Sequence, residues 1–236
     1  FYITYSVNGD AAMKFTAASE TPDATTGAII RNCYIEDSHF AGIQFKWYTA
    51  SCMAEDNWIE KSQMGIWIYD NSHDNIARRN IIHRLYKWDA TEDNDFFRAF
   101  GTDHIISDNV GYGTIPTEVE GSHVDCFQTY DNNGEAIDGI VVERNYFAGF
   151  FDTTGILQCE TYYGCGSSDP IIFRNNIYDV SDYSATYDCS GSNCLNGFQP
   201  GAIKIDVINN TFIGFTHYVL SGGTLVENFA NNIIYN

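Results

Sequence analysis

Two stretches of this chain, "IARRNII" (residues 76–82) and "VVERNYF" (residues 141–147), decide how it folds. Each has two or three apolar residues, a polar pair, an asparagine and two more apolar residues. The same template returns as "IIRNCYI", "IISDNVG", "IFRNNIY", "DVINNTF" and "ENFANNII". One short pattern repeated along a chain indicates an architecture in which each copy packs mainly on its neighbours.

Alignment of these segments defines one recurring position, which holds Cys33, Asn80, Asn109, Asn145, Asn176, Asn210 and Asn232. Successive members are 47, 29, 36, 31, 34 and 22 residues apart. The first interval has room for two turns, because "MGIWIYDN" (residues 64–71) resembles the strands that lie between the other asparagines. Short β-rich runs at a ragged period predict an all-β solenoid whose loops vary in length.

The repeat and its asparagine column resemble the right-handed parallel β-helix superfamily, which includes pectate lyases, polygalacturonases and many tailspikes and adhesins. The resemblance runs from about Thr26 onward. It implies a single right-handed parallel β-helix of about seven to eight turns with an internal asparagine ladder. Residues 1–236 would form one domain, with residues 1–25 as an N-terminal cap or an incomplete first turn.

Charge narrows the range of partners. The chain has 31 Asp and Glu against 12 Lys and Arg, a net charge of −19, so nucleic acid and anionic membranes are not expected to bind it. No apolar run approaches the roughly 18 residues that span a bilayer. Without a signal peptide at its start, the numbering is expected to begin after processing or inside a longer chain.

The seven cysteines predict the compartment. Two close pairs, in "CETYYGC" (residues 159–165) and "CSGSNC" (residues 189–194), suit disulfides that close small loops, so we expect an extracellular, secreted protein. The alternative, a metal site, lacks zinc spacing and a nearby histidine, and no metal site is predicted. Cys33 and Cys52 are candidates for a third bridge, which leaves Cys126 as a reduced core thiol.

The stretch "GSHVDCFQTYD" (residues 121–131) carries the candidate chemistry. Alternation places His123, Asp125 and Phe127 on one strand face, and Val124, Cys126 and Gln128 on the other. Comparison with neighbouring strands aligns Asp125 with three glycines, Gly42, Gly65 and Gly155. The expectation is a solvent-facing notch that contains the Asp125 carboxylate.

Four more residues complete the expected site. Arg98 aligns near Asp125 and would keep it ionised as base or nucleophile, unless a slip of one residue turns Arg98 inward. His123 would donate or relay the proton, and Asp95 or Asp152 would supply a second carboxylate. The alternative is that His123 and Asp125 are only a hydrogen-bonded surface pair.

"HVDCFQ" (residues 123–128) resembles His-x-Asp-x-x-Gln stretches of β-helix proteins that act on polysaccharides. The chain lacks the Asp-Asp, Gly-His-Gly and Arg-x-Lys motifs of polygalacturonases and the calcium-binding acids of the lyases. The resemblance implies a protein that cleaves a polysaccharide, by hydrolysis rather than elimination. The outward parity of Trp67 favours stacking of its ring on a sugar, and we expect Phe127 and Gln128 to contact the glycan as well. Trp67 could instead be partly buried under a loop.

No cofactor is expected, apart from Ca²⁺ if the glycan is polyanionic. The second function class is a structural or adhesive β-helix, such as a filament subunit that stacks end to end as a homo-oligomer, or a tailspike or adhesin segment.

The cysteine pattern makes a direct prediction. Mass spectrometry of an unreduced digest should find Cys159 linked to Cys165 and Cys189 linked to Cys194, with Cys126 as a free thiol. A bridge that includes Cys126 would contradict its assignment to the core face of its strand.

Overall fold

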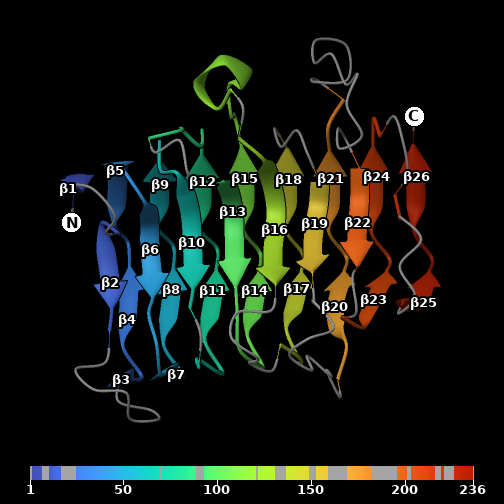
Figure 1. The fold of residues 1–236 in the computed structure, drawn as a ribbon, viewed down its shortest axis with the longest axis horizontal. Helices are drawn as coiled ribbons and strands as arrows, with labels where there is room; N and C mark the ends of the chain where they lie inside the picture. The colour runs from blue at the N-terminus through green and yellow to red at the C-terminus, as the bar shows by residue number, and fades with distance from the viewer. Residues whose placement is uncertain are drawn as a thin grey trace.

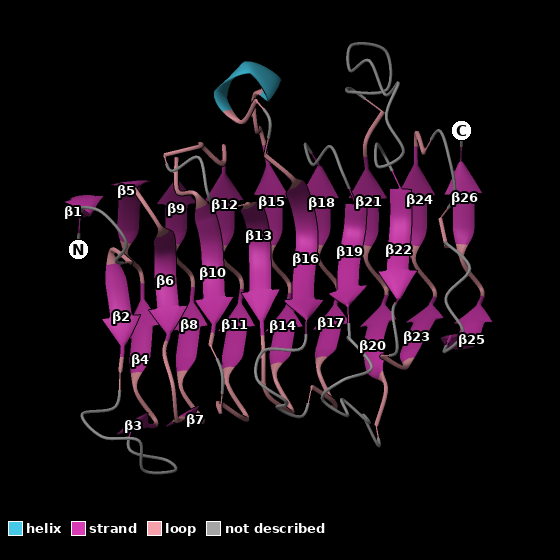
Figure 2. Cartoon of the chain, in the orientation of Figure 1, coloured by secondary structure: helices cyan, strands magenta, loops and turns pink. Residues whose placement is uncertain are grey.

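The computed structural model describes residues 2–6, 11–16, 25–69, 71–88, 93–120, 122–130, 137–148, 153–158, 169–181, 196–200, 203–215, 219–220 and 226–235. Nearly all regular structure in these ranges is β-strand, and their one helical element is the 3₁₀ turn η1 (Pro116–Glu118). Figure 2 shows this turn above the strands, at the end of a loop.

Three long sheets, all with parallel neighbours, make up the molecule. The nine-stranded sheet contains, in order, β1 (Tyr2–Ser6), β5 (Tyr34–Ser38), β9 (Trp58–Glu60), β12 (Ile81–His83), β15 (Val110–Tyr112), β18 (Tyr146–Ala148), β21 (Ile177–Asp179), β24 (Thr211–Ile213) and β26 (Ile233–Tyr235). The seven-stranded sheet contains β2 (Met13–Phe15), β6 (Ala41–Phe45), β10 (Met64–Ile68), β13 (Asn94–Ala99), β16 (Val124–Tyr130), β19 (Thr153–Gln158) and β22 (Asn196–Pro200). The eight-stranded sheet contains β4 (Ile29–Arg31), β8 (Met53–Glu55), β11 (Ile76–Arg78), β14 (Ile105–Ser107), β17 (Val141–Glu143), β20 (Ile171–Arg174), β23 (Ile205–Ile208) and β25 (Val226–Ala230). A fourth sheet pairs only β3 (Thr25–Thr26) with β7 (Thr49–Ala50).

The chain visits the three long sheets in rotation, so that each circuit adds one strand to each of them. Figure 1 shows the resulting solenoid from the side, with the seven-stranded sheet towards the viewer and the two termini at opposite ends. The predicted all-β, parallel β-helix architecture is confirmed. Strands β1 and β2, which lie within residues 1–25, pair with β5 and β6 and extend two of the sheets.

A sharp turn joins the eight-stranded sheet to the nine-stranded sheet on every circuit. Its first residue has a positive φ between 53° and 58° although it is never glycine: Asn32, Asp56, Arg79, Asp108, Arg144, Asn175, Asn209 and Asn231. L-residues other than Asn and Asp enter this region at a cost, so the turn needs compensating interactions.

The residue that follows each positive-φ residue supplies these compensating interactions. Asn145 is typical: its Nδ2 donates to Asn176 Oδ1 (3.0 Å) and to the carbonyl of Ile106 (3.0 Å). Its Oδ1 accepts from both the backbone N–H and the Nδ2 of Asn109, at 2.8 and 3.0 Å. Equivalent amide–amide bonds of 2.9–3.2 Å join Asn57, Asn80, Asn109, Asn145, Asn176, Asn210 and Asn232.

Asn57 also belongs to this column, although the sequence alignment did not include it. The segment "MAEDNWI" (residues 53–59) carries the full template. Its place between Cys33 and Asn80 divides the interval of 47 residues into two circuits. Cys33 holds the same position at the other end of the column, where its backbone N–H donates to Asn57 Oδ1 at 3.0 Å.

Inside the solenoid, aromatic rings from the three sheets contact one another. Phe147 and Tyr178 stack at 5.9 Å between centroids, Tyr178 and Phe212 at 5.2 Å, and Phe173 meets Phe198 at 4.5 Å. Burial of such rings is the main apolar contribution to stability, at about 25 cal/mol per Å².

The described cysteines, Cys33, Cys52 and Cys126, are all buried free thiols. The suggested Cys33–Cys52 bridge is therefore wrong: both residues occupy turn positions where their backbone N–H groups donate to asparagine side chains of the next circuit. Cys126 is a core thiol, and burial raises its pKa well above the ordinary value. The two close pairs, Cys159–Cys165 and Cys189–Cys194, lie outside the described residues.

The asparagine column yields a stability prediction. Asn145→Ala should lower the free energy of unfolding by about 2–4 kcal/mol, since it leaves several buried backbone and amide groups without partners at about 1–3 kcal/mol each. Asn228→Ala, which removes an exposed asparagine of β25, is the matched control and should cost less than about 0.5 kcal/mol. Urea denaturation compares them, and equal losses would contradict a special role for the column.

Candidate active site

Two aspartates lie side by side on the seven-stranded sheet. Asp95 of β13 and Asp125 of β16 are direct register partners, which places their Cα atoms about 4.8 Å apart. Both are completely buried. Two carboxyl groups held together away from water are costly for a fold, so the pair indicates a function rather than a packing role.

The outward direction of Asp95 follows from its neighbours. The two residues after it, Phe96 and Phe97, both contact the core ring of Phe147, with centroids 5.9 Å away in each case. Two consecutive inward residues break the alternation of a regular strand. Asp95 precedes the two inward residues and Arg98 follows them, so both side chains lie on the outer side of the sheet and can contact each other.

Arg98 bonds to Asp95. Its Nε donates to Asp95 Oδ2 at 2.7 Å, and its Nη2 lies 2.6 Å from the same oxygen and 3.6 Å from Asp93 Oδ2. The guanidinium also lies over the rings of Trp67 (5.3 Å) and Tyr130 (5.9 Å). With only 3% of Arg98 exposed, this ion pair is shielded from solvent and geometrically fixed.

Burial raises the pKa of Asp95 to about 6. The positive charge of Arg98 acts against this rise, and the negative charge of Asp93 adds to it. A carboxyl group with a pKa near 6 can hold a proton close to neutral pH, which is what a general acid requires.

Three polar residues lie near the carboxyl pair. His123 is exposed, its carbonyl accepts a bond from the Asn94 backbone N–H at 2.8 Å, and its positive form lowers the pKa of Asp95. The Asp93 side chain is 38% exposed, and Gln128 Nε2 lies 3.5 Å from Asp93 Oδ2. Because the Asp95 and Asp125 side chains are fully buried, a substrate can touch them only if the side chains over them move.

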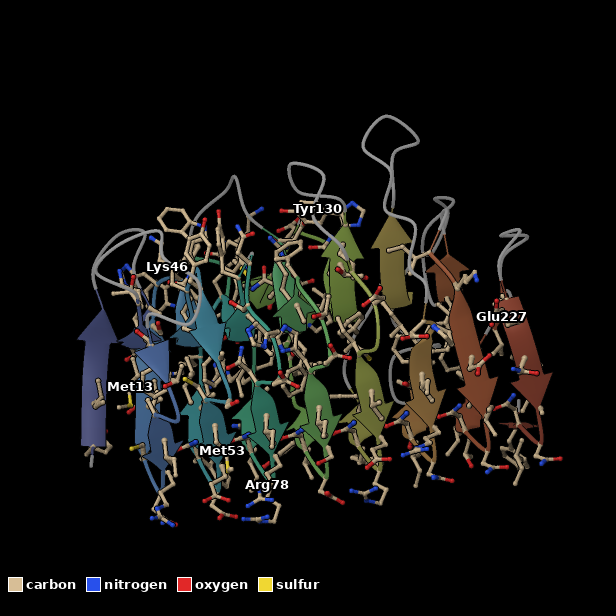
Figure 3. All side chains as sticks on the ribbon, turned by 90° about the horizontal axis from the view of Figure 1, so that it is seen from below. Met13, Lys46, Met53, Arg78, Tyr130 and Glu227 are labelled. Atoms are coloured by element: carbon tan, nitrogen blue, oxygen red, sulfur yellow. The ribbon has the colours of Figure 1, made fainter. Side chains whose placement is uncertain are left out.

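A row of aromatic rings crosses the C-terminal ends of the same strands, and it was not anticipated. Trp47 contacts Tyr69 (5.5 Å), Tyr69 contacts Phe100 (6.2 Å) and Phe100 contacts Tyr130 (4.8 Å). Lys46 lies over Trp47 at 4.5 Å. Figure 3 shows Lys46 and Tyr130 across the solenoid from Met53 and Arg78 of the eight-stranded sheet.

Asp93 was also missed. The signal was present as "EDND" (residues 92–95), in which Asp93 and Asp95 are two residues apart and so share one face of an extended segment. Tyr130 and Phe100 carried no comparable signal, because their contact depends on the register between β13 and β16.

The predicted glycine column is wrong. Gly42 and Gly65 are level with Phe96 and Cys126, one place beyond Asp125, and Gly155 pairs with Phe127. A Cβ on Gly65 would lie 2.6 Å from Ile82 Cδ1, so this glycine allows close packing in the core and forms no outer notch. The expectation that Asp125 faces solvent is wrong as well, since it is fully buried.

Of the remaining predicted residues, some lie near the carboxyl pair and others do not. Arg98 is in register with Trp67 and Gln128 rather than Asp125, and its bonded carboxylate is Asp95. Phe127 is wrong as a substrate contact, because its ring lies against Phe173 in the core, 5.5 Å away.

Trp67 lies on the outer side as expected, but it is only 6% exposed and packs against Phe40 and Tyr69, so it offers no free ring face. Asp152 lies outside the described residues. The structure thus brings Asp95, Arg98, His123 and Asp125 into one region and excludes Phe127 from it.

Among the described residues, no group of three or more His, Cys, Asp and Glu side chains is arranged to hold a metal ion. None of the helical structure in the same ranges is long and apolar enough to cross a membrane.

The fold and this site define a parallel β-helix with a carboxyl pair on the outer side of one sheet. No family model and no curated protein matches the sequence. Solved structures do match. The chain aligns over 99% of its length with 78% of an alginate lyase from Paenibacillus sp. str. FPU-7, at a TM-score of 0.56 and 15% identity.

The chain is also similar to the tailspike protein of E. coli bacteriophage HK620 in complex with a pentasaccharide. The TM-score is 0.51 at 14% identity, with 94% of this chain aligned. The aligned part is 42% of the tailspike chain. At such identities the similarity establishes the fold and does not transfer an activity.

The buried ion pair predicts a pH-dependent stability. The pKa of Asp95 is about 6 in the folded state, above the roughly 3.9 of an unfolded aspartate, so its protonated form favours folding. That contribution is complete below about pH 4 and is lost as the pH rises through about 6. The positive charge of Arg98 stabilises ionised Asp95 and so limits the loss of stability at high pH. Arg98→Met removes that charge and should destabilise the protein by about 3–5 kcal/mol more at pH 8 than at pH 4.

Urea denaturation at both pH values measures the difference. The double variant Asp95→Asn/Arg98→Met has no carboxylate left to bury, so the extra loss at high pH should disappear. An Arg98→Met effect that is the same at both pH values would show that Asp95 is not the group responsible.

Proposed function

We propose that this protein binds and cleaves a polysaccharide by acid–base catalysis, with Asp95 and Asp125 as its paired carboxyl groups. The observation that carries the proposal is their register pairing on adjacent strands, with Arg98 bonded to Asp95. Enzymes that hydrolyse glycosidic bonds use two carboxyl groups in different protonation states. The raised pKa of Asp95 and the charged and polar groups around it supply the required asymmetry.

In this proposal Asp95 is the acid. Its proton passes to the glycosidic oxygen as the bond between that oxygen and the anomeric carbon breaks, and the Asp125 carboxylate attacks the anomeric carbon to form a glycosyl ester. Asp95, now ionised, takes a proton from water, whose oxygen attacks the same carbon and releases Asp125. Carboxyl groups on strands about 4.8 Å apart suit this double displacement, which needs separations of about 5–5.5 Å.

Hydrolysis is favoured over elimination by the environment of Arg98. Elimination from a uronate needs positive charge on the substrate carboxylate and a base beside it. The buried guanidinium is instead bonded to Asp95 and close to Asp93. The similar structures, an alginate lyase and a tailspike in complex with a pentasaccharide, support a carbohydrate ligand for this protein. An extracellular location is part of the proposal and agrees with the acidic surplus.

Substitution of the carboxyl pair tests the proposal. Asp95→Asn and Asp125→Asn should each lower kcat on a cleaved glycan by at least ~10²-fold, because each removes a positioned acid, base or nucleophile. Asp206→Asn, on the eight-stranded sheet, removes an equivalent charge away from the site and should leave kcat unchanged. NMR of the first product should show retention of anomeric configuration. Full activity of either site variant would exclude the carboxyl pair.

The pH profile gives an independent test. Activity should fall as the pH rises above about 6, where Asp95 loses its proton. Asp93→Asn removes a charge that raises the pKa of Asp95, so the fall should move to lower pH, whereas His123→Ala should move it to higher pH. Rates measured across the pH range reveal both shifts, and shifts in the same direction would contradict the assignment of the acid.

The structural or adhesive function class, with its end-to-end homo-oligomer, stays a prediction. A folded protein that neither binds nor cleaves any glycan, and whose Asp95→Asn and Asp125→Asn variants only become more stable, would favour that class.

A further inference from the structure

We infer, on the basis of the proposed function, that the glycan is uncharged rather than a polyuronate. The inference comes from the positions of the Lys and Arg side chains and from the groups to which they are bonded.

Every one of the 12 Lys and Arg residues lies within the described ranges, so all positive side chains of the chain can be placed apart from the histidines. Five of them form ion pairs along the eight-stranded sheet and the turn that follows it: Arg31, Arg78, Arg79, Arg144 and Arg174, with Glu55, Asp56, Asp108 and Glu143. These positive side chains are paired with carboxylates of the solenoid itself and lie on a different sheet from the site.

Four more have acidic or carbonyl partners elsewhere. Lys61 pairs with Asp37, Lys204 with Glu227 and Arg84 with Glu118, and Lys87 donates to the carbonyl of Glu120. Three remain on or next to the seven-stranded sheet: Lys14, Lys46 and Arg98. Lys46 lies over Trp47, at the opposite end of the strands from Asp95.

The site itself has an acidic surplus. Asp93 and Asp95 lie beside one guanidinium, that of Arg98, and Asp125 is the register partner of Asp95. A carboxylate on a sugar at this site would meet three acidic side chains and be repelled by them, and the guanidinium beside them is already bonded to Asp95.

A bridging cation would relieve that repulsion, but the described residues provide no group of three or more acidic, His or Cys side chains that could hold one. The seven-stranded sheet also offers what an uncharged sugar uses. At the other end of its strands, Trp47, which is 39% exposed, lies under Lys46 and begins the aromatic row that ends at Tyr130. Sugar C–H faces pack on exposed rings such as Trp47, whereas Phe100 within the row is buried. Gln128 and Asp93 add hydrogen-bonding groups for hydroxyls.

The test uses ligands matched in linkage and length. Polygalacturonate and alginate are each compared with their carboxyl-reduced, neutral forms, together with glucan, mannan and galactan, in EDTA and in Ca²⁺. Affinity electrophoresis and release of reducing ends are the measurements. We expect at least one neutral polymer to be bound, and each polyuronate to bind at least ~10-fold more weakly than its neutral form under both conditions.

A matched pair of variants tests the surface. Trp47→Ala should weaken binding of the neutral polymer by at least ~10-fold, whereas Trp58→Ala, on the nine-stranded sheet, should leave it unchanged. Tighter binding of a polyuronate than of its reduced form, with or without Ca²⁺, would overturn the inference and leave the proposed cleavage function intact. Failure to bind or cleave any polymer would instead overturn the proposed function.

Discussion

The column of buried asparagine amides is the interaction on which the rest of the structure depends. Each amide bonds to the next circuit and to backbone groups at the turn, so the circuits cannot slide past one another without breaking several buried hydrogen bonds at once. The positive-φ residue before each asparagine is tolerated for the same reason. Once the register is fixed at this corner, outward side chains of neighbouring strands are brought next to each other.

Register then decides which charges are neighbours. On the eight-stranded sheet it brings opposite charges together, as in Arg78 with Glu55 and Arg174 with Glu143. On the seven-stranded sheet it places two carboxyl groups, Asp95 and Asp125, next to each other and out of water. Stability alone favours the first arrangement and opposes the second. The contrast within one solenoid is the strongest physical reason to assign chemistry to the second sheet.

Arg98 connects the two halves of the proposed site. Its guanidinium bonds to Asp95 on one side and lies over Trp67 and Tyr130 on the other, so the aromatic row and the carboxyl pair share one buried cation. A buried ion pair of this kind contributes little net stability compared with apolar packing, but it holds an acid in a defined orientation. Orientation of the acid is what cleavage of a glycosidic bond would require.

The sequence by itself determined the solenoid, because the asparagine template repeats at the period of the circuits and is visible without knowledge of any contact. It also singled out Asp95, Arg98, His123 and Asp125, since charged groups in short apolar strands are conspicuous. Only the tertiary structure decided how they combine. Phe96 and Phe97 of β13 both turn into the core, and so do the residues level with them on β16, Cys126 and Phe127, which breaks the alternation from which Phe127 and the glycine column were inferred. The asparagine column fixes the register at one corner of each circuit. Which residues of the seven-stranded sheet then face each other depends on the lengths of the intervening loops and on packing against the other two sheets, and no local pattern in one strand encodes either of them.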